Sequence, residues 1–361
     1  MRTPAPVTRP AAISRAARPP PHPCHTPETN EGETPVSGTP SRPRARLRRF
    51  VVACAAATLA LTLVACGSPG DDATSQATGT SARTVQTPDG PVQIPAKPKR
   101  IIGLSYAAAW LLDAGVSMVG VTDIDENALT EQQRAQIKKV PLVGEGNELN
   151  LEKIVSLWPD LIVISAPKRV TFPIDKLKPI APVLSYGIGD PDELLPTSLK
   201  VDDAAGRAAA GEQTKKTYTD KLAELKAKYA DKLTGKKWAI VNSGEAGKFS
   251  VYTASSWLGI VLKDLGVTWA PVKGVDGGDF SFDKSFEEIG TLAAADVILV
   301  DGDEPGGSPS AETATLLGQQ NWKALKAARD GQVHPIRGFF TSRYQEAVRI
   351  LGDIESFLPS L

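Results

Sequence analysis

The chain has 361 residues with 41% hydrophobic and 23% charged side chains, a composition typical of globular proteins with room for two domains. Its cysteines are Cys24, Cys54 and Cys66, so the chain beyond residue 66 offers no disulfide, zinc finger or thiol nucleophile. Beyond residue 65 it carries 32 basic and 38 acidic residues, a net charge of −6, which argues against nucleic acid as a partner.

The first 65 residues do not look like part of the fold. Residues 1–44 are rich in Pro and Arg and lack apolar periodicity, so we expect them to be disordered. The basic stretch RPRARLRRF and the 15 uncharged residues that follow it, 51–65, are typical of a secretory signal over about 45–65. This apolar core is shorter than the roughly 20 residues that a transmembrane helix needs.

The signal ends in a sequence that resembles the lipobox of bacterial lipoproteins, Leu63-Val64-Ala65-Cys66. We predict cleavage before Cys66 and diacylation of its thiol; the alternative is that Cys66 is one more apolar residue of the signal. Two or three acyl chains give stable membrane anchoring, where one gives marginal binding. Residues 66–83, rich in Ser, Thr, Gly and Asp, then form a flexible tether, and the protein is expected outside the cytoplasm, anchored to the cell membrane.

The ordered part begins with a hairpin, because Val85, Val92 and Ile94 alternate around Pro88-Asp89-Gly90. Short apolar runs then alternate with helical stretches, which predicts α/β lobes with largely parallel sheets. The predicted strands are 100–104, 118–121, 161–165, 238–242, 297–301 and 332–336.

A long polar helix is predicted between the two strand groups. Within 211–235, the side chains Leu222, Leu225, Tyr229 and Leu233 share one face. At 1.5 Å per residue this helix is a rod of roughly 30–35 Å, either an ordinary surface helix or a rigid spacer. We predict an N-terminal lobe over 84–205, the interlobe helix over 206–234 and a C-terminal lobe over 235–361.

One internal repeat favours two related lobes. NLEKIVSLWPDLIVIS (150–165) and SFEEIGTLAAADVILV (285–300) each have a capping residue, a glutamate two positions later, a short amphipathic helix, an aspartate and an apolar strand. The alternative is coincidence, since helix-to-strand units are common.

Five motifs in order resemble class III periplasmic binding proteins, the receptors for ferric siderophores, haem and vitamin B12 that feed ABC importers. They are VQIPAKPKRIIGL, LNLEKIVSLWPDLIVIS, the mid-chain helix, SFEEIGTLAAADVILV and GQVHPI, and they span about residues 84–361. The resemblance implies two α/β lobes bridged by one long helix, with little hinge closure and the ligand in a cleft between the lobes.

The resemblance also implies that one surface glutamate per lobe docks onto arginines of the permease. By motif match these are Glu152 and Glu287. A carboxylate in the first turn of a helix is also favoured by the helix dipole alone. Ser285 and Glu288 form a capping box, which gives Glu288 a local role and leaves Glu287 free.

Enzymatic chemistry is poorly supported by the residues. The turn Gly103-Leu-Ser-Tyr-Ala has the outline of a nucleophile elbow but lacks the full G-x-S-x-G. Only His334 could serve as a base beyond the signal, so an extracytoplasmic serine hydrolase using Ser105 and His334 is a distant alternative. One histidine is also too few for a bare zinc or manganese site.

A bulky metal chelate needs aromatic walls and guanidinium or hydroxyl donors, placed beyond the C-terminal ends of the strands. We predict that the ligand is contacted by Tyr106, Trp110, Arg169, Tyr252, Trp257, Arg337, Arg343 and Tyr344. Further candidates are Lys168, Phe249, Phe339 and Phe340. Each of these side chains could instead belong to the core or to an ion pair.

Together these features predict a monomeric solute-binding lipoprotein of an ABC importer, with no catalytic residues and no resident cofactor. The preferred cargo is a ferric siderophore, of hydroxamate type on family frequency, whose iron is held by the siderophore. Haem, with Tyr106 or Tyr344 as iron ligand, and cobalamin remain alternatives. An interaction protein with a vestigial cleft is the alternative of a different class.

Overall fold

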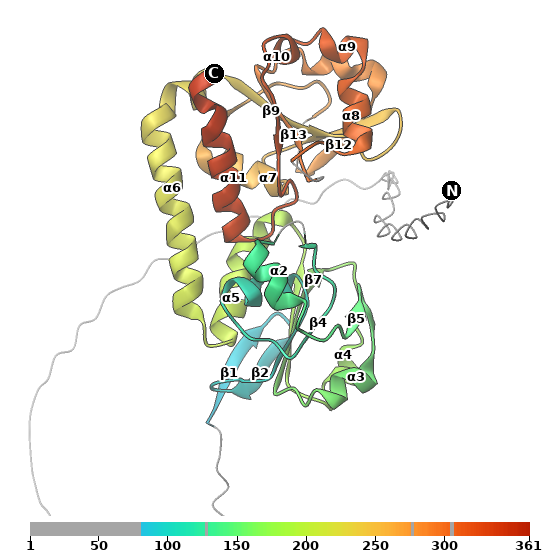
Figure 1. The fold of residues 1–361 in the computed structure, drawn as a ribbon, viewed down its shortest axis with the longest axis vertical. Helices are drawn as coiled ribbons and strands as arrows, with labels where there is room; N and C mark the ends of the chain where they lie inside the picture. The colour runs from blue at the N-terminus through green and yellow to red at the C-terminus, as the bar shows by residue number, and fades with distance from the viewer. Residues whose placement is uncertain (1–80, 127–128, 276–277, 304–306) are drawn as a thin grey trace, which may run out of the picture. The chain divides into compact units, whose positions relative to one another are not determined.

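The computed structural model describes residues 81–126, 129–275, 278–303 and 307–361 (Figure 1). The predicted signal, Cys66 and most of the predicted tether lie outside the described residues. The description opens on the antiparallel strands β1 (Ala82–Thr87) and β2 (Gly90–Pro95), with Thr87 paired to Gly90. The predicted hairpin is therefore confirmed, and its Val85 and Ile94 are buried against the first lobe.

The N-terminal lobe is built on a four-stranded parallel sheet in the order β4-β3-β7-β8. Its strands are β4 (Gly120–Val121), β3 (Ile101–Ser105), β7 (Leu161–Pro167) and β8 (Val183–Ile188). The central strands β3 and β7 are buried along nearly their whole length, as expected of a parallel sheet with both faces covered.

Helices cover both faces of this sheet. Those on one face are α1 (Tyr106–Asp113), α2 (Glu131–Ile137) and α5 (Leu194–Ala204), and those on the other are α3 (Leu151–Ser156) and α4 (Ile174–Leu177). The lobe also contains the small hairpin of β5 (Gly144–Glu145) and β6 (Glu148–Leu149) and the 3-10 turn η2 (Pro191–Glu193).

The C-terminal lobe has a six-stranded mixed sheet in the order β12-β10-β9-β13-β14, with β11 paired to the start of β9. Its strands are β9 (Lys237–Asn242), β10 (Lys248–Tyr252), β11 (Thr268–Trp269), β12 (Ser281–Ser285), β13 (Val297–Asp301) and β14 (Val333–Ile336). Strands β9, β13 and β14 run parallel, whereas β10 is antiparallel to both of its neighbours. The two-lobed α/β prediction is confirmed, although β8 of the first sheet and β10, β11 and β12 of the second were not predicted.

Two apolar clusters lie on opposite faces of this second sheet. One contains side chains of α6 (Ala208–Gly235), α7 (Trp257–Leu265) and α11 (Tyr344–Phe357), which continues into η4 (Leu358–Ser360). The other contains side chains of η3 (Phe286–Leu292), α8 (Ala311–Leu317), α9 (Gln320–Lys323) and α10 (Lys326–Arg329).

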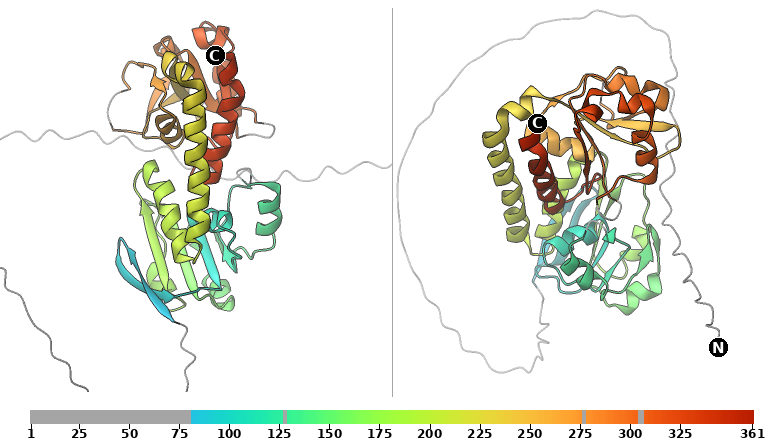
Figure 2. Two further views of the ribbon diagram at one scale, coloured as in Figure 1. Left: turned by 90° about the vertical axis from the view of Figure 1, so that its left-hand side faces the viewer. Right: turned by 45° about the horizontal axis from the view of Figure 1, so that its top comes forward.

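Helix α6 joins the two lobes, packing on α5 in the first and on α11 in the second (Figures 1 and 2). It is not one straight rod, because Tyr229 has non-helical φ and ψ of −128° and 26°. The break lies where α6 already packs on the core of the C-terminal lobe, so the part that leaves the N-terminal lobe is continuous. No helix within the described ranges is long and apolar enough to cross a membrane.

The internal repeat is present in the hydrogen bonds. The Asp160 N–H donates to Arg100 O at 2.9 Å, and its carboxylate accepts the Arg100 N–H at 2.8 Å. The Asp296 N–H donates to Lys237 O at 2.8 Å, and its carboxylate accepts the Lys237 N–H at 3.0 Å. In both lobes the repeat therefore ties the start of a central strand to the strand beside it.

A glycine in α7 generates the first prediction. A Cβ added at Gly259 would lie 1.9 Å from Thr253 O, so α7 could not keep its place against the turn that leads to Trp257. We expect Gly259→Ala to lower the free energy of unfolding by about 1–3 kcal/mol in urea denaturation, as overpacking does.

Gly352→Ala in α11 is the matched control, since an added Cβ there meets nothing within 4 Å. It should leave stability unchanged or raise it by up to about 1 kcal/mol. Superimposable curves for Gly259→Ala and the unmodified protein would contradict the close approach.

Candidate functional site

The first wall of the candidate site stands at the carboxyl edge of the N-terminal sheet. There β3 ends at Ser105, which pairs with Ser165 of β7 and whose N–H donates to Thr122 Oγ1 at 2.8 Å. Ser105 has φ 55° and ψ −133°, a strained conformation for a residue other than glycine. This sharp turn makes Tyr106 the first residue of α1 and places it at the carboxyl edge.

The structure brings two predicted ligand residues together at this edge, Tyr106 and Arg169. Burial raises the pKa of Tyr106 and the positive charge of Arg169 lowers it, so the two side chains lie within electrostatic reach. Arg169 is exposed and forms no ion pair with the part of the chain that the structure describes. Its neighbour Lys168, by contrast, lies 3.6 Å from a carboxylate oxygen of Glu193. Arg169 is therefore available to an anionic group.

The second wall is an aromatic cluster of the C-terminal lobe, Trp257, Phe280 and Phe340. The Trp257 ring centroid lies 5.1 Å from that of Phe280 and 5.3 Å from that of Phe340, both edge to face. Phe340 is exposed, and Trp257 packs against apolar clusters of both lobes. The aromatic cluster therefore lies where the two lobes meet.

Three other aromatic candidates are buried, and two of them, Tyr252 and Phe339, pack beneath this cluster. Tyr252 is buried, its hydroxyl donates to Asn242 Oδ1 at 3.1 Å, and its ring packs on Phe339 and Phe340. Burial raises the Tyr252 pKa above its usual range. Phe339 and Phe249 are core residues. Tyr252 therefore supports the wall instead of forming its surface.

Phe280 was not predicted as a site residue, because it precedes β12, a strand that was not predicted either. Asp303, in the loop after β13, also escaped it. Burial raises the pKa of Asp303 despite hydrogen bonds from the Gly338 and Phe339 backbone, and the charge of Asp125 raises it further. Asp303 and Asp125, from different lobes, thus lie within electrostatic reach of each other. The position of Asp303 directly after an apolar strand was the available signal.

Arg337 follows β14 as predicted, but it has an acidic partner. Its Nη2 lies 3.2 Å from Asp353 Oδ1 of α11. The ion pair that the sequence left as an alternative is thus what the structure shows.

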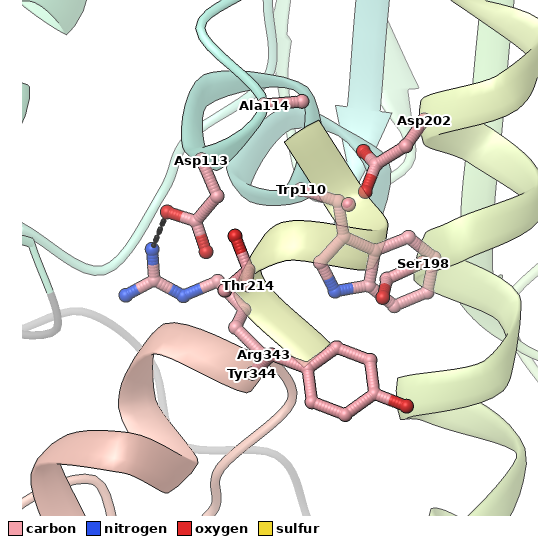
Figure 3. A pocket seen from close by; sticks show the side chains of 9 residues that line it. Trp110, Asp113, Ala114, Ser198, Asp202, Thr214, Arg343 and Tyr344 are labelled. Carbon is pink, nitrogen blue, oxygen red and sulfur yellow. Dashed lines mark hydrogen bonds and ion pairs between the residues drawn. The ribbon is translucent and has the colours of Figure 1, made fainter. Parts of the chain in front are cut away.

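Trp110 and Arg343 are corrections, because they join the lobes instead of facing a ligand (Figure 3). Trp110 is 1% exposed, and its indole N–H donates to Ser342 O at 2.8 Å. Arg343 is 3% exposed and donates to Asp113 Oδ1 at 2.8 Å and to Glu346 Oε1 at 2.9 Å. These contacts tie α1 of the first lobe to the start of α11 in the second.

Tyr344 is also a correction. With Trp110 and Arg343 it lines a cavity of about 20 Å³, which holds one water molecule but no metal chelate (Figure 3). Its ring packs 5.7 Å from that of Tyr218, and burial raises the pKa of Tyr344 to about 12. Tyr344 is thus half-buried against Tyr218 and this small cavity, a place suited to the contact between the lobes.

Two buried carboxyl groups line the same cavity. Burial raises the pKa of Asp113 to about 6, although the positive charge of Arg343 opposes this shift. Burial and the charge of Asp113 raise the pKa of Asp202 to about 7. Asp202 Oδ1 is buried and has no hydrogen-bond partner among the described residues.

A larger hollow of about 670 Å³ lies on the N-terminal lobe alone, against β7, β8 and α5. None of the eight predicted ligand residues lines it. Its charged side chains, Lys168, Lys200, Asp89, Asp192 and Glu193, are of mixed sign.

The hydrolase alternative fails on geometry. His334 Nε2 lies 2.9 Å from Gln332 Oε1, and its ring stacks on Phe357 at 3.7 Å. Burial lowers the pKa of His334 to about 4. Among the described residues, the one histidine is therefore engaged with Gln332 and Phe357 and forms no hydrogen bond with Ser105. Across the described residues, no group of three or more His, Cys, Asp or Glu side chains could hold a metal ion.

The two predicted docking glutamates are both exposed, Glu152 on α3 and Glu287 on η3. The capping box of Ser285 and Glu288 is confirmed, because the Glu288 carboxylate accepts the Ser285 N–H at 2.9 Å. This hydrogen bond lowers the Glu288 pKa. Glu288 therefore caps η3 and Glu287 does not.

A family model for periplasmic binding proteins matches residues 103–337. The chain belongs to the periplasmic binding protein family. Its members are substrate-binding proteins and not enzymes. The resemblance seen in the sequence is thereby confirmed.

Relatives of this binding protein are found among both sequences and structures. The iron(3+)-hydroxamate-binding protein YxeB of Bacillus subtilis is 28% identical over 277 residues, 74% of this chain and 81% of YxeB. The Fe(3+)-citrate-binding protein YfmC of the same species is 26% identical over 259 residues, 70% of this chain and 78% of YfmC.

Two solved structures extend the comparison. The siderophore periplasmic binding protein from the fuscachelin gene cluster of Thermobifida fusca is 29% identical, with a TM-score of 0.67 over 74% of this chain and 98% of that one. SirA of Staphylococcus aureus, complexed with staphyloferrin B, is 27% identical, with a TM-score of 0.62 over 77% of this chain and 98% of that one.

The cavity between the lobes yields a pH prediction. The folded-state pKa of Asp202, about 7, lies above the ordinary aspartate pKa of 3.8, so ionisation lowers the stability of the fold as the pH rises between these values. Asp202→Asn removes that cost. We expect similar free energies of unfolding for both proteins near pH 4, and a gain on the order of 2–4 kcal/mol for Asp202→Asn at pH 8.

Urea unfolding at several pH values measures this difference. Thr214→Val, a change at another residue of the cavity lining, is the control and should show no pH-dependent gain. A constant difference between Asp202→Asn and the unmodified protein at all pH values would contradict the raised pKa.

Proposed function

We propose that this protein is the extracytoplasmic receptor of an ABC importer and that it captures a ferric siderophore between its two lobes. The observation that carries the proposal is an exposed Arg169, within electrostatic reach of Tyr106 and without an ion pair among the described residues, together with the aromatic cluster at the junction of the lobes. Guanidinium suits the oxygen-rich face of an iron chelate, and aromatic rings suit its organic frame. Relatives are named for binding iron(3+)-hydroxamate and Fe(3+)-citrate.

A hydroxamate-type chelate fits the charges better than a citrate-type chelate. Of the cations near the predicted site, Lys168 and Arg337 have acidic partners and Arg343 is buried between the lobes. Arg169 alone of these four lacks an ion pair with the described residues. One available guanidinium favours a ligand of low negative charge over a polycarboxylate, which would need several cations.

Haem is less well supported. Tyrosine binds haem iron as a phenolate. Burial raises the pKa of both Tyr106 and Tyr344, which opposes that form, and Tyr344 lines the one-water cavity.

Delivery of the chelate to the permease would depend on the lipid at Cys66 and on the two docking glutamates. Cys66, outside the described residues, would carry the lipid that holds the receptor at the membrane, and the relative YfiY is named a probable siderophore-binding lipoprotein. Glu152 and Glu287 would contact arginines of the permease while a separate subunit hydrolyses ATP. The receptor would act as a monomer, and the iron would stay within its chelate.

The ligand proposal is tested by calorimetric titration of the protein with each of five ligands: a ferric hydroxamate, a ferric catecholate, ferric citrate, haem and cobalamin. It predicts saturable binding of the ferric hydroxamate. We expect Arg169→Ala to weaken that binding about tenfold, since it removes a charge-assisted hydrogen bond. Lys168→Ala is the control and should change affinity less than about threefold, because Lys168 already pairs with Glu193. Saturable binding of none of these ligands would overturn the proposal.

The docking proposal predicts that Glu152→Ala combined with Glu287→Ala leaves chelate affinity unchanged and abolishes iron uptake by cells. Both carboxylates are exposed, so their loss should not unfold the protein. Glu288→Gln is the control, because glutamine keeps the cap of η3 while a neighbouring charge is lost. Iron uptake by the double variant equal to that of the unmodified protein would contradict docking through the two glutamates and leave them a role only at the ends of their helices.

A further inference from the structure

The most exposed large apolar side chain of the described residues is an indole. Trp158 is 77% exposed, and Val155, three residues earlier, is also exposed. The Trp158 backbone adopts φ 46°, a left-handed conformation that residues other than glycine seldom take. The chain thus holds a large apolar ring in water on a strained backbone.

This exposure is built into the fold, because hydrogen bonds fix the backbone around Trp158. Arg100 Nε donates to Trp158 O at 2.8 Å, and its Nη2 donates to Leu157 O. Asp160, two residues on, accepts the N–H groups of Lys99 and Arg100 at 2.8 Å each. The indole therefore stands on a segment tied to the start of β3, not on a frayed helix end.

Trp158 follows the end of α3, the helix that carries the proposed docking glutamate. Glu152 and Val155 are one turn apart on α3 and share its exposed side. The helix ends directly after them, and the Trp158 N–H donates to Val155 O at 3.0 Å. A carboxylate, a valine and an indole thus follow one another on this surface.

The C-terminal lobe provides an internal comparison. In the repeat, Glu287 corresponds to Glu152 and Gly290 to Val155, and both residues of the second lobe are exposed. Counting back from the equivalent aspartates, Asp160 and Asp296, places Ala294 opposite Trp158. The second lobe therefore has the carboxylate without the large apolar side chains. Both lobes therefore present a glutamate, and they differ in the apolar side chains beside it.

We propose that Trp158 and Val155 are the apolar anchor with which the N-terminal lobe docks onto the permease of the importer, beside the contact made by Glu152. This inference rests on the proposed function. The occupant is a permease surface that offers a cation to Glu152 and an apolar hollow to the indole. Tryptophan next to a charged contact is typical of residues that dominate binding energy. Because the C-terminal lobe lacks this anchor, the receptor docks more strongly through its N-terminal lobe.

A lipid surface is the less suitable occupant. The exposed Glu152 carboxylate lies one turn from Val155, and an anionic bilayer would repel it. A cation on a protein surface would instead attract the same carboxylate.

The test uses the full lipidated chain and its permease in nanodiscs, with affinity measured by biolayer interferometry. We expect Trp158→Ala to weaken binding to the permease at least about tenfold, as loss of a central aromatic contact does. Leu142→Ala is the matched control, since Leu142 is an exposed apolar side chain of the same lobe outside α3. It should change affinity less than about twofold. Calorimetry should give the same chelate affinity for all three proteins.

The outcomes separate this inference from the proposed function. Permease binding by Trp158→Ala equal to that of the unmodified chain, with chelate binding intact, overturns the anchor alone. If Trp158→Ala weakens binding to empty nanodiscs of the same lipid by the same factor, the indole contacts the bilayer and the anchor proposal is overturned. The proposal is also overturned if the unmodified chain forms a dimer that Trp158→Ala abolishes. Normal docking of the unmodified chain without binding of any ferric chelate overturns the proposed ligand and leaves the anchor standing.

Discussion

The buried ion pair between Asp113 and Arg343 is the interaction on which the two-lobed arrangement depends most. It joins α1, the first helix of the chain's first lobe, to the start of α11, the last helix of its second. Breaking such a pair leaves an uncompensated buried charge, which is strongly destabilising. Together with α6 it gives the lobes two separate connections, and the Trp110 to Ser342 hydrogen bond strengthens the second. Two connections leave less freedom for hinge motion than a single helix would.

This connection also decides which residues remain for a ligand. Trp110 and Arg343 have the chemistry of a chelate site, but the contact between the lobes uses both. What remains is Arg169 with Tyr106 on one side and the cluster of Trp257, Phe280 and Phe340 on the other. These residues, one guanidinium and a set of aromatic rings, are the basis of the proposal that the ligand is a weakly charged chelate.

The repeat gives the two lobes a common plan that is used unequally. Asp160 and Asp296 make the same backbone contacts, so the units that carry Glu152 and Glu287 are built in the same way. Their surroundings differ, because Trp158 in one lobe corresponds to Ala294 in the other. The two lobes therefore share a backbone plan and differ in the apolar side chains beside their glutamates.

The sequence by itself determined the α/β class, the hairpin, the long helix, the internal repeat and the family, because these depend on local periodicity, capping and motif order. It missed β8, β10, β11 and β12, and with β12 the preceding Phe280, because short strands carry little periodic signal of their own. Which aromatic and charged residues face a ligand was decided only by the tertiary structure. A tryptophan, an arginine and a tyrosine after a strand look alike in sequence whether they meet solvent or a helix more than 200 residues away. Trp110, Arg343 and Tyr344 were placed by that long-range packing between lobes, which no local pattern in the sequence specifies.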